Sequence, residues 1–376
     1  MTIKSLAYSA QQHLQASTGG SFKRAHIYEL LAASFGFNSN AALGADAVFT
    51  EQSLSSRRAS SYGSLVRNRC IDIGYQPDVA DAASIALPAY LSERQIGVIR
   101  IADLVAHLRY EAGHQDDYSD DDEEPDDRDD TLDDQWVDSV ALESPILLDG
   151  LEDAASKGNG LAHYALALIH APEEDEERKV GRDYWHSQAQ QGRLLTGVEK
   201  EWADEYATNL ARSEKSARHL REAARLGQQD ALLDLADRFD DPAFFEQAAP
   251  HSNANPTVVA EIAQRLGRYG DAKKWLTIAA EAGDTEAMRQ LIEEYDQRDL
   301  VRCWTWVYFA KLMDVDLTMD EHYAIDEDGS PYDDDVGGAA FVGGRDGVVI
   351  NPISAEQDAA ARHAAQQLMG RIRLAE

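Results

Sequence analysis

The sequence predicts an all-α protein, in which a solenoid of helical-hairpin repeats follows an N-terminal helical module and carries a small β-hairpin insertion near its C-terminus. Apolar residues recur at helical spacing through most of the 376 residues, and glycines recur at nearly regular intervals after residue 150. Hydrophobic residues make up 44% and charged residues 27%, which is the composition of a chain that folds.

Residues 1–113 form the predicted helical module. Residues 3–15 have the pattern of a first helix, Ser21 is placed to cap a second that Gly36 ends, and residues 38–40 can start a third. Farther on, residues 79–91 and 96–110 have the apolar spacing of two amphipathic helices. These patterns predict a helical module.

The string from Tyr28 to Leu43 carries a resemblance. It reads Tyr-Glu-Leu-Leu-Ala-Ala-Ser-Phe-Gly-Phe-Asn-Ser-Asn-Ala-Ala-Leu and resembles a short bacterial module known as glyoxalase-related. That module carries Glu-Leu-x-Ala-x-x-x-Gly-Phe followed by a tryptophan, whereas Asn40 stands near the tryptophan position here. The resemblance implies no enzyme, because this stretch lacks a set of metal ligands.

The same residues also resemble a helix-turn-helix, with Ala32 and Gly36 at the tight crossing. A recognition helix needs side chains that reach base edges, and residues 40–43, Asn-Ala-Ala-Leu, supply little such chemistry. Four basic residues could still contact phosphate, namely Lys23, Arg24, Arg57 and Arg58. A regulator that contacts DNA through this module is the leading alternative function, although we do not expect nucleic acid as the partner.

Residues 114–136 are predicted to be an acidic linker. The run from Asp116 to Asp134 contains almost no apolar residue, and like charges repel one another along it.

The charge of the whole chain is unevenly distributed along the sequence. Residues 1–113 hold ten basic and nine acidic side chains, while residues 114–376 hold the other 25 and 59, which accounts for the net charge of −33.

An internal repeat follows the linker. Four segments share a glycine that comes three residues after an alanine, with glycines at Gly158, Gly192, Gly227 and Gly283. Glycine adopts the left-handed conformation that ends a helix, and small residues on either side let two antiparallel helices approach closely. The predicted unit is therefore a helical hairpin, which buries its apolar face only by stacking on neighbouring hairpins.

These segments resemble the Sel-one-like repeat, a relative of the tetratricopeptide repeat with the pattern Trp-Tyr-x-x-Ala-Ala-x-x-Gly-x-x-x-Ala-x-x-x-Leu. The best match is Trp275 to Gly283, Trp-Leu-Thr-Ile-Ala-Ala-Glu-Ala-Gly. The resemblance covers residues 137–314 and departs from the pattern where the last two glycines stand 56 residues apart and where Asp314 replaces the glycine of a further unit. It implies a bacterial scaffold that binds proteins.

Residues 315–353 form a predicted insertion and residues 354–376 a C-terminal capping helix. Phe341-Val342 and Val348-Val349-Ile350 flank a glycine-rich turn and suggest a β-hairpin. The acidic segment from Asp326 to Asp335 lacks the alternating spacing of an EF-hand loop, so we expect no calcium site there.

No motif in the sequence identifies a catalytic, cofactor or metal site. The two cysteines, Cys70 and Cys303, are far apart, and the eleven histidines form neither HExxH nor a cluster with zinc spacing. No serine lies in a GxSxG elbow. We therefore expect a protein that is not an enzyme and needs no cofactor.

The predicted function is a protein–protein interaction scaffold or adaptor. The acidic charge favours a basic protein as the partner. Aromatic side chains dominate interface energetics, so the candidate anchors are Trp185, Trp202, Trp275, Trp304 and Trp306. A further alternative is an immunity or antitoxin protein that masks a basic toxin.

The expected compartment is the cytoplasm. Two isolated cysteines fit a reducing environment. The first residues lack the apolar stretch of a signal peptide, and no window approaches the length of a membrane span, so we expect no membrane partner.

Overall fold

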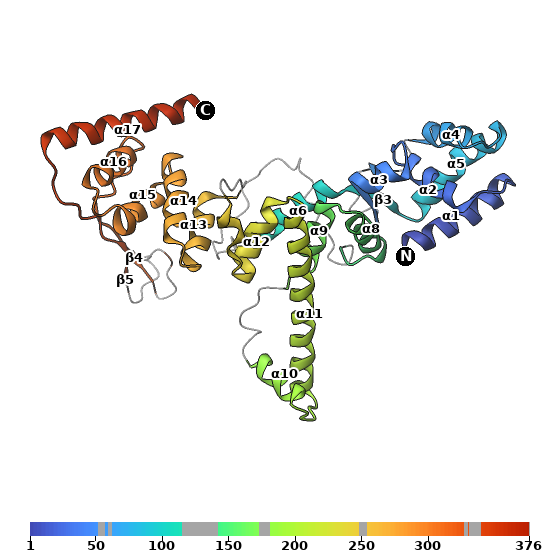
Figure 1. Cartoon of the computed structure of the whole chain (residues 1–376), viewed down its shortest axis with the longest axis horizontal. Helices are drawn as coiled ribbons and strands as arrows, with labels where there is room; N and C mark the ends of the chain where they lie inside the picture. The colour runs from blue at the N-terminus through green and yellow to red at the C-terminus, as the bar shows by residue number, and fades with distance from the viewer. Residues whose placement is uncertain are drawn as a thin grey trace. The chain divides into compact units, whose positions relative to one another are not determined.

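The computed structural model describes residues 1–51, 57–58, 62–114, 142–172, 181–247, 254–326, 330 and 340–375. These residues are mostly helical (Figure 1). They form two compact units, Met1–Leu235 and Ala236–Glu376. The predicted acidic linker lies outside the described residues except for His114, as does most of the acidic segment from Asp326 to Asp335.

The first unit begins with helices whose ends follow local signals. Thr2 caps the first helix through its side chain, and Gly19 ends it with a φ of 68°. Ser39 caps the third helix by accepting from the backbone N–H of Ala42. The second helix starts three residues after Ser21, which is therefore not its cap. The helices are α1 (Ile3–Thr18), α2 (Arg24–Ala33), α3 (Asn40–Asp46), α4 (Gly63–Asp72), α5 (Pro77–Glu93) and α6 (Ile101–His114).

The N-terminal part of this unit also contains a sheet, which corrects the all-α prediction. Strands β1 (Ala47–Glu51), β2 (Arg57–Arg58) and β3 (Ile96–Arg100) form an antiparallel sheet in the order β1-β3-β2. Residues 96–110 are thus a strand followed by α6, and not one helix. Ile96, Val98 and Ile99 are all buried, and β-branched side chains buried on both faces favour a strand.

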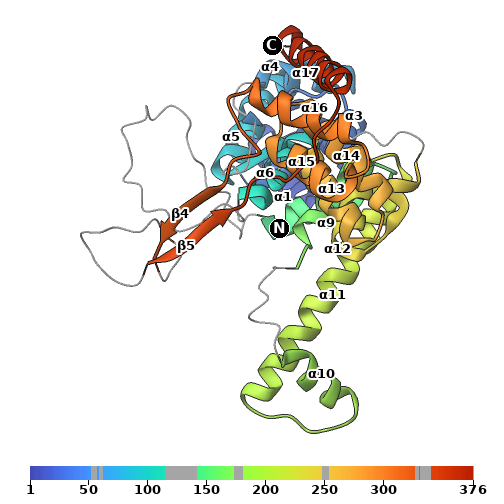
Figure 2. The same cartoon turned by 90° about the vertical axis from the view of Figure 1, so that its left-hand side faces the viewer.

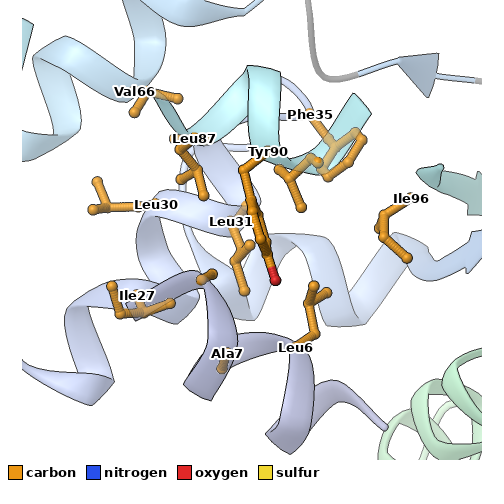
Figure 3. Close-up of a cluster of buried hydrophobic side chains, with 14 of the residues drawn as sticks. Leu6, Ala7, Ile27, Leu30, Leu31, Phe35, Val66, Leu87, Tyr90 and Ile96 are labelled. Carbon is orange, nitrogen blue, oxygen red and sulfur yellow. The ribbon is translucent and has the colours of Figure 1, made fainter. Parts of the chain in front are cut away.

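The core of the N-terminal part lies between α1, α2 and α5 (Figure 3). Leu6 of α1, Leu30 and Leu31 of α2 and Leu87 of α5 are completely buried there. The hydroxyl of Tyr90 enters the same core and donates to Ser9 Oγ at 2.8 Å. The helices predicted near residues 3–15, 21–35 and 79–91 are present as α1, α2 and α5.

The rest of the first unit is built from α8 (Pro145–Ser156), α9 (Gly160–Ile169), α10 (Arg182–Gln190), α11 (Val198–Arg225) and the part of α12 (Gln229–Phe239) up to Leu235. All four repeat glycines have positive φ, as the sequence predicts: Gly158, Gly192, Gly227 and Gly283. At Gly227 the glycine N–H donates to the carbonyl of Ala224 and the next N–H donates to that of Ala223. This pair of bonds is the Schellman motif, which ends helices at a left-handed residue.

The second unit continues the helix-turn-helix pattern. Gly267 supplies one more turn of the same kind inside the long gap between repeat glycines, and Asp314 itself adopts a φ of 65° where the sequence lacks glycine. The elements are η4 (Pro242–Glu246), α13 (Pro256–Arg265), α14 (Tyr269–Glu281), α15 (Thr285–Gln290), η5 (Leu291–Tyr295), α16 (Leu300–Lys311), β4 (Glu321–Ile325), β5 (Phe341–Arg345) and α17 (Ala355–Ala375). Stacking of the hairpins into a solenoid stays a prediction.

The C-terminal β-hairpin exists, but its partner strand differs from the prediction. β5 pairs with β4, and residues 348–350 are not a strand. Val348 is buried in the core of the second unit, and its backbone N–H donates to Leu317 at 2.8 Å. The helix predicted for residues 354–376 is present as α17, which packs on α16 and buries Ala361 and Ala365.

Two leucine-sized side chains on α5 test the assigned core. Leu87→Ala should lower the free energy of unfolding of the first unit by about 2–5 kcal/mol, because it opens a cavity in a packed core. Ile85→Ala, two residues away at a side chain that is 75% exposed, should change it by less than about 0.5 kcal/mol. Protease cleavage across a urea series, with first-unit fragments identified by mass spectrometry, gives both values. If both substitutions lowered the free energy of unfolding equally, the assignment of Leu87 to the core would be wrong.

Candidate functional site

The most exposed helical part of the first unit is a two-helix arm, defined here as residues 181–211, that is α10 and the first half of α11. α10 buries no side chain. In the arm, α11 buries only Ala203, and its other buried residues begin at Ser216. Figures 1 and 2 show α10 alongside the first half of α11, beyond the segment of α11 that packs on α9.

Polar and aromatic contacts hold the arm together in place of an apolar core. Arg182 of α10 forms an ion pair with Glu205 of α11 at 2.9 Å. The rings of His186 and Tyr206 lie 5.2 Å apart between the same two helices. The guanidinium of Arg193 lies 5.0 Å from the centre of the Trp185 ring. These contacts fix the pairing of the helices but leave apolar side chains uncovered.

Five large apolar side chains of the arm are exposed: Tyr184, Leu194, Val198, Trp202 and Leu210. Val198 and Trp202 are one helical turn apart and share a face of α11. Trp202 is 38% exposed and Leu194 is 95% exposed. Grouped apolar side chains on a surface, above all aromatic ones, mark sites where another molecule binds.

The five candidate tryptophans fall into two groups. Trp185 and Trp202 belong to the arm. Trp275 stacks on Phe244 with ring centres 6.2 Å apart, and the indole N–H of Trp304 donates to the Asn351 carbonyl at 3.0 Å. Trp306 is 2% exposed. The last three tryptophans therefore pack within the second unit, and among the five only Trp202, at 38%, is exposed.

The basic residues of the DNA-binding alternative are spread over the N-terminal part. Lys23 and Arg24 are exposed at the start of α2, where Arg24 donates to the Lys4 carbonyl at 2.9 Å. The backbones of Arg57 and Arg58 pair with β3, and the structure does not describe the side chains of these two residues. The exposed residues of α3 include Ala41, Ala42 and Ala45, which offer no side-chain hydrogen bond to a base edge.

A buried carboxylate in the second unit forms another polar cluster. The side chain of Asp296 is 1% exposed and follows η5, a short π-helix. Lys273 of α14 lies 2.6 Å from one of its oxygens, and Arg302 of α16 lies 2.9 Å from the other. The Trp306 indole N–H also donates to Asp296, at 3.1 Å. One carboxylate therefore joins α14, η5 and α16.

The cluster borders a cavity of about 530 Å³. Three cationic and three anionic side chains line it: Lys273, Arg298, Arg302, Glu294, Asp296 and Asp299. The formal charges of these six side chains balance. Because both oxygens of Asp296 are engaged, we assign the cluster a structural role. Sequence reasoning missed it, since Asp296 is one of 68 acidic residues and no local motif marks it.

The two cysteines are poor nucleophiles in this fold. Both are buried and unpaired. Burial raises the pKa of the Cys70 thiol to about 11. Burial, together with the nearby charges of Asp296 and Asp299, also raises the pKa of the Cys303 thiol to about 11. Thiols with such pKa values stay protonated at neutral pH and react slowly.

The described residues contain neither a cluster of metal ligands nor a helix that could span a membrane. Nowhere in the described ranges do three or more His, Cys, Asp or Glu side chains come together as metal ligands. Within the same ranges, every helix is too short or too polar to cross a bilayer.

Comparison with known proteins gives no relative. No protein-family model matches the chain, and neither a curated protein nor a solved structure matches it. The resemblances to the Sel-one-like repeat and to the glyoxalase-related module therefore rest on the residues quoted for them.

The structural role of Asp296 can be tested by removing its charge. Asp296→Asn leaves Lys273 and Arg302 without their counter-charge, and because both cations are partly exposed, the second unit should lose only about 1–3 kcal/mol of stability. Glu294→Gln, at an exposed carboxylate of the same cavity, should change stability by less than about 0.5 kcal/mol. Native-state hydrogen exchange of α14 and α16 measures both effects. A fully stable Asp296→Asn protein would refute the assignment.

Proposed function

We propose that this protein is a scaffold or adaptor without catalytic activity, and that it binds another protein through the arm. The observation that carries the proposal is the exposure of Val198 and Trp202 on a helical hairpin that buries only one alanine of α11. A helix pair of this kind gains stability when a third element covers its apolar face. A protein helix or an extended segment could provide that cover.

Trp202 is the anchor that we expect to contribute most. An indole buries a large apolar area, and covering apolar surface contributes about 25 cal/mol per Å². Val198 lies one turn away and widens the same contact. Trp185 is half-buried under Arg193 and is better placed at the rim than at the centre of the interface.

The charge of the chain favours a basic partner. The arm holds three basic and five acidic residues, and two of the basic ones, Arg182 and Arg193, are ion-paired within the arm. Glu201 and Asp204 are exposed beside Trp202 in the sequence. A partner that presents lysine or arginine around an apolar centre would complement this surface and avoid repulsion by the net charge of −33.

The proposal includes the Sel-one-like assignment of residues 137–314 and a cytoplasmic location. Helix-ending glycines at the repeat positions support the first part, although α11 is a single helix of 28 residues that runs from the second repeat turn into the third repeat. Two unpaired, buried cysteines support a reducing compartment.

The test is affinity purification with three baits, each made from the full chain. They are the original sequence and the variants Trp202→Ala and Ile85→Ala. A protein captured by the original chain should be lost with Trp202→Ala and kept with Ile85→Ala, which shortens an apolar side chain exposed on α5. With the purified partner, Trp202→Ala should weaken the Kd by about tenfold or more, as expected for an aromatic hot spot. Circular dichroism checks that α11 stays helical, since alanine favours helix.

Two outcomes would overturn the proposal. If Trp202→Ala and Ile85→Ala retain the same captured proteins with the same Kd, the arm is not the binding surface. If the original chain forms a dimer in sedimentation and Trp202→Ala is a monomer, the arm binds a second copy and the partner is not a basic protein.

A further inference from the structure

Two histidines meet where α11 joins the rest of the first unit. His163 of α9 and His219 of α11 place their Nδ1 atoms 3.0 Å apart. His219 is 5% exposed. His170 lies two turns along α9 from His163, and its ring centre is 6.4 Å from that of His219. The three imidazoles therefore line one stretch of the contact between α9 and α11.

The contact between the two Nδ1 atoms depends on the protonation of both rings. A hydrogen bond at 3.0 Å requires one Nδ1 to carry a proton and the other to offer its lone pair. When both rings are protonated, two N–H donors face each other and both rings carry positive charge. The geometry then has no acceptor, and the two imidazolium rings repel each other.

The Nε2 atoms of the buried histidines also make protonation of these rings unfavourable. The Nε2 atoms of His170 and His219 are buried and have no hydrogen-bond partner among the described residues. A neutral ring can leave one such nitrogen as an unused acceptor, whereas an imidazolium there would bury an unsatisfied donor. Protonation therefore places both a charge and an unpaired N–H in the interface.

The surrounding charges come from three segments. Lys215 and Arg218 of α11 face His219, as does Glu152 of α8. Lys215 and Glu152 also form an ion pair with each other at 3.3 Å. Around His170 the facing charges are Lys215 and Arg212 of α11, Glu152 of α8 and Glu143 just before α8. α6 also packs on α9, but its Arg109 is paired with Asp230 near Tyr164.

Burial is the main cause of the shifted titration, with neighbouring charges second. Burial, His163 and Arg218 lower the pKa of His219 to about 4. Burial, Lys215 and Arg212 also lower the pKa of His170. The rings of His219 and His170 are therefore neutral in the folded protein at neutral pH.

The histidines lie at the root of the arm. Just beyond them, Ser216 Oγ donates to the Ala167 carbonyl at 2.8 Å and Arg212 donates to the Ile169 carbonyl at 3.2 Å. These bonds join the second half of α11 to α9, and the first half of the same helix is the arm. A change in the packing of α9 against α11 therefore acts on the anchorage of the arm.

We propose that the contact between His163 and His219 is a pH-sensitive lock that holds α11 on α9 at neutral pH and opens on mild acidification. Opening would release the root of the arm. The consequence for a bound partner rests on the proposed function of the arm, whereas the lock itself does not.

The sign of the effect follows from the titration of His219. An unfolded histidine titrates near pH 6.5, above the value of about 4 in the folded protein. Between these two values the open form binds more protons than the closed form, so the closed form loses stability as the pH falls. Above about pH 7 both forms are neutral and the stability no longer depends on this group.

Hydrogen exchange on the full chain tests the lock. Protection of α9 and of residues 212–223, corrected for intrinsic rates, should fall by about tenfold or more between pH 7.5 and pH 5.0, where most carboxylates are still ionised. His219→Phe should remove most of this pH dependence, because its ring no longer titrates and only the contribution of His170 remains. His363→Asn, at an exposed histidine of α17, should keep it in full.

A second variant covers the case in which His219→Phe does not fold. His163→Asn replaces a half-buried ring and retains an acceptor for the Nδ1–H of His219, so it should fold and show a smaller pH dependence. Unchanged protection in the original chain between the two pH values would overturn the proposal. So would a loss of protection in His219→Phe or His163→Asn as large as in the original chain. Partner binding by the arm is measured separately at pH 7.5, so failure of one claim is distinguishable from failure of the other.

Discussion

The left-handed residue that ends many of the helices is the constraint on which the helical part of this protein depends. Four repeat glycines, the additional Gly267 and Asp314 all have positive φ. At these positions the chain reverses within a few residues and the orphan carbonyls of the preceding helix are satisfied. Without such a turn, α8 and α9 or α13 and α14 could not lie side by side.

The same turns explain why the arm exists. At Gly192 the chain reverses, but the next helix continues for 28 residues, past the end of α10 and into the contact with α9. One half of α11 therefore packs in the unit while the other half has only α10 beside it. The exposed Trp202 and the buried His219 lie on these two halves of one helix, so the proposed binding surface and its anchorage belong to the same element.

Local signals in the sequence predicted the local structure well. The helix-ending glycines, the start of the third helix at residues 38–40 and the final helix α17 were all recognisable from a few adjacent residues, because caps and left-handed turns depend on nearest neighbours. The strands were not predictable in this way. β1 and β3 pair residues about fifty positions apart, and the run at Ile96 fits a buried strand or a buried helix equally well by periodicity. β4 was missed for the same reason, since its partner β5 is also distant in the sequence.

The candidate sites also differ in how far the sequence alone could predict them. Tryptophans could be named from the sequence as anchors, but their burial decides which ones are accessible, and burial depends on the assembled unit. The Asp296 cluster and the histidine pair each join side chains from separate helices. No spacing along the chain marks such a cluster, because its members meet only after the helices have packed.

The most direct test of the central claim is hydrogen exchange of the full chain with and without a captured partner. If the arm is the binding surface, residues 181–211 should gain protection in the complex, with the largest change around Trp202. Protection confined to other parts of either unit, with unchanged exchange in the arm, would contradict the account.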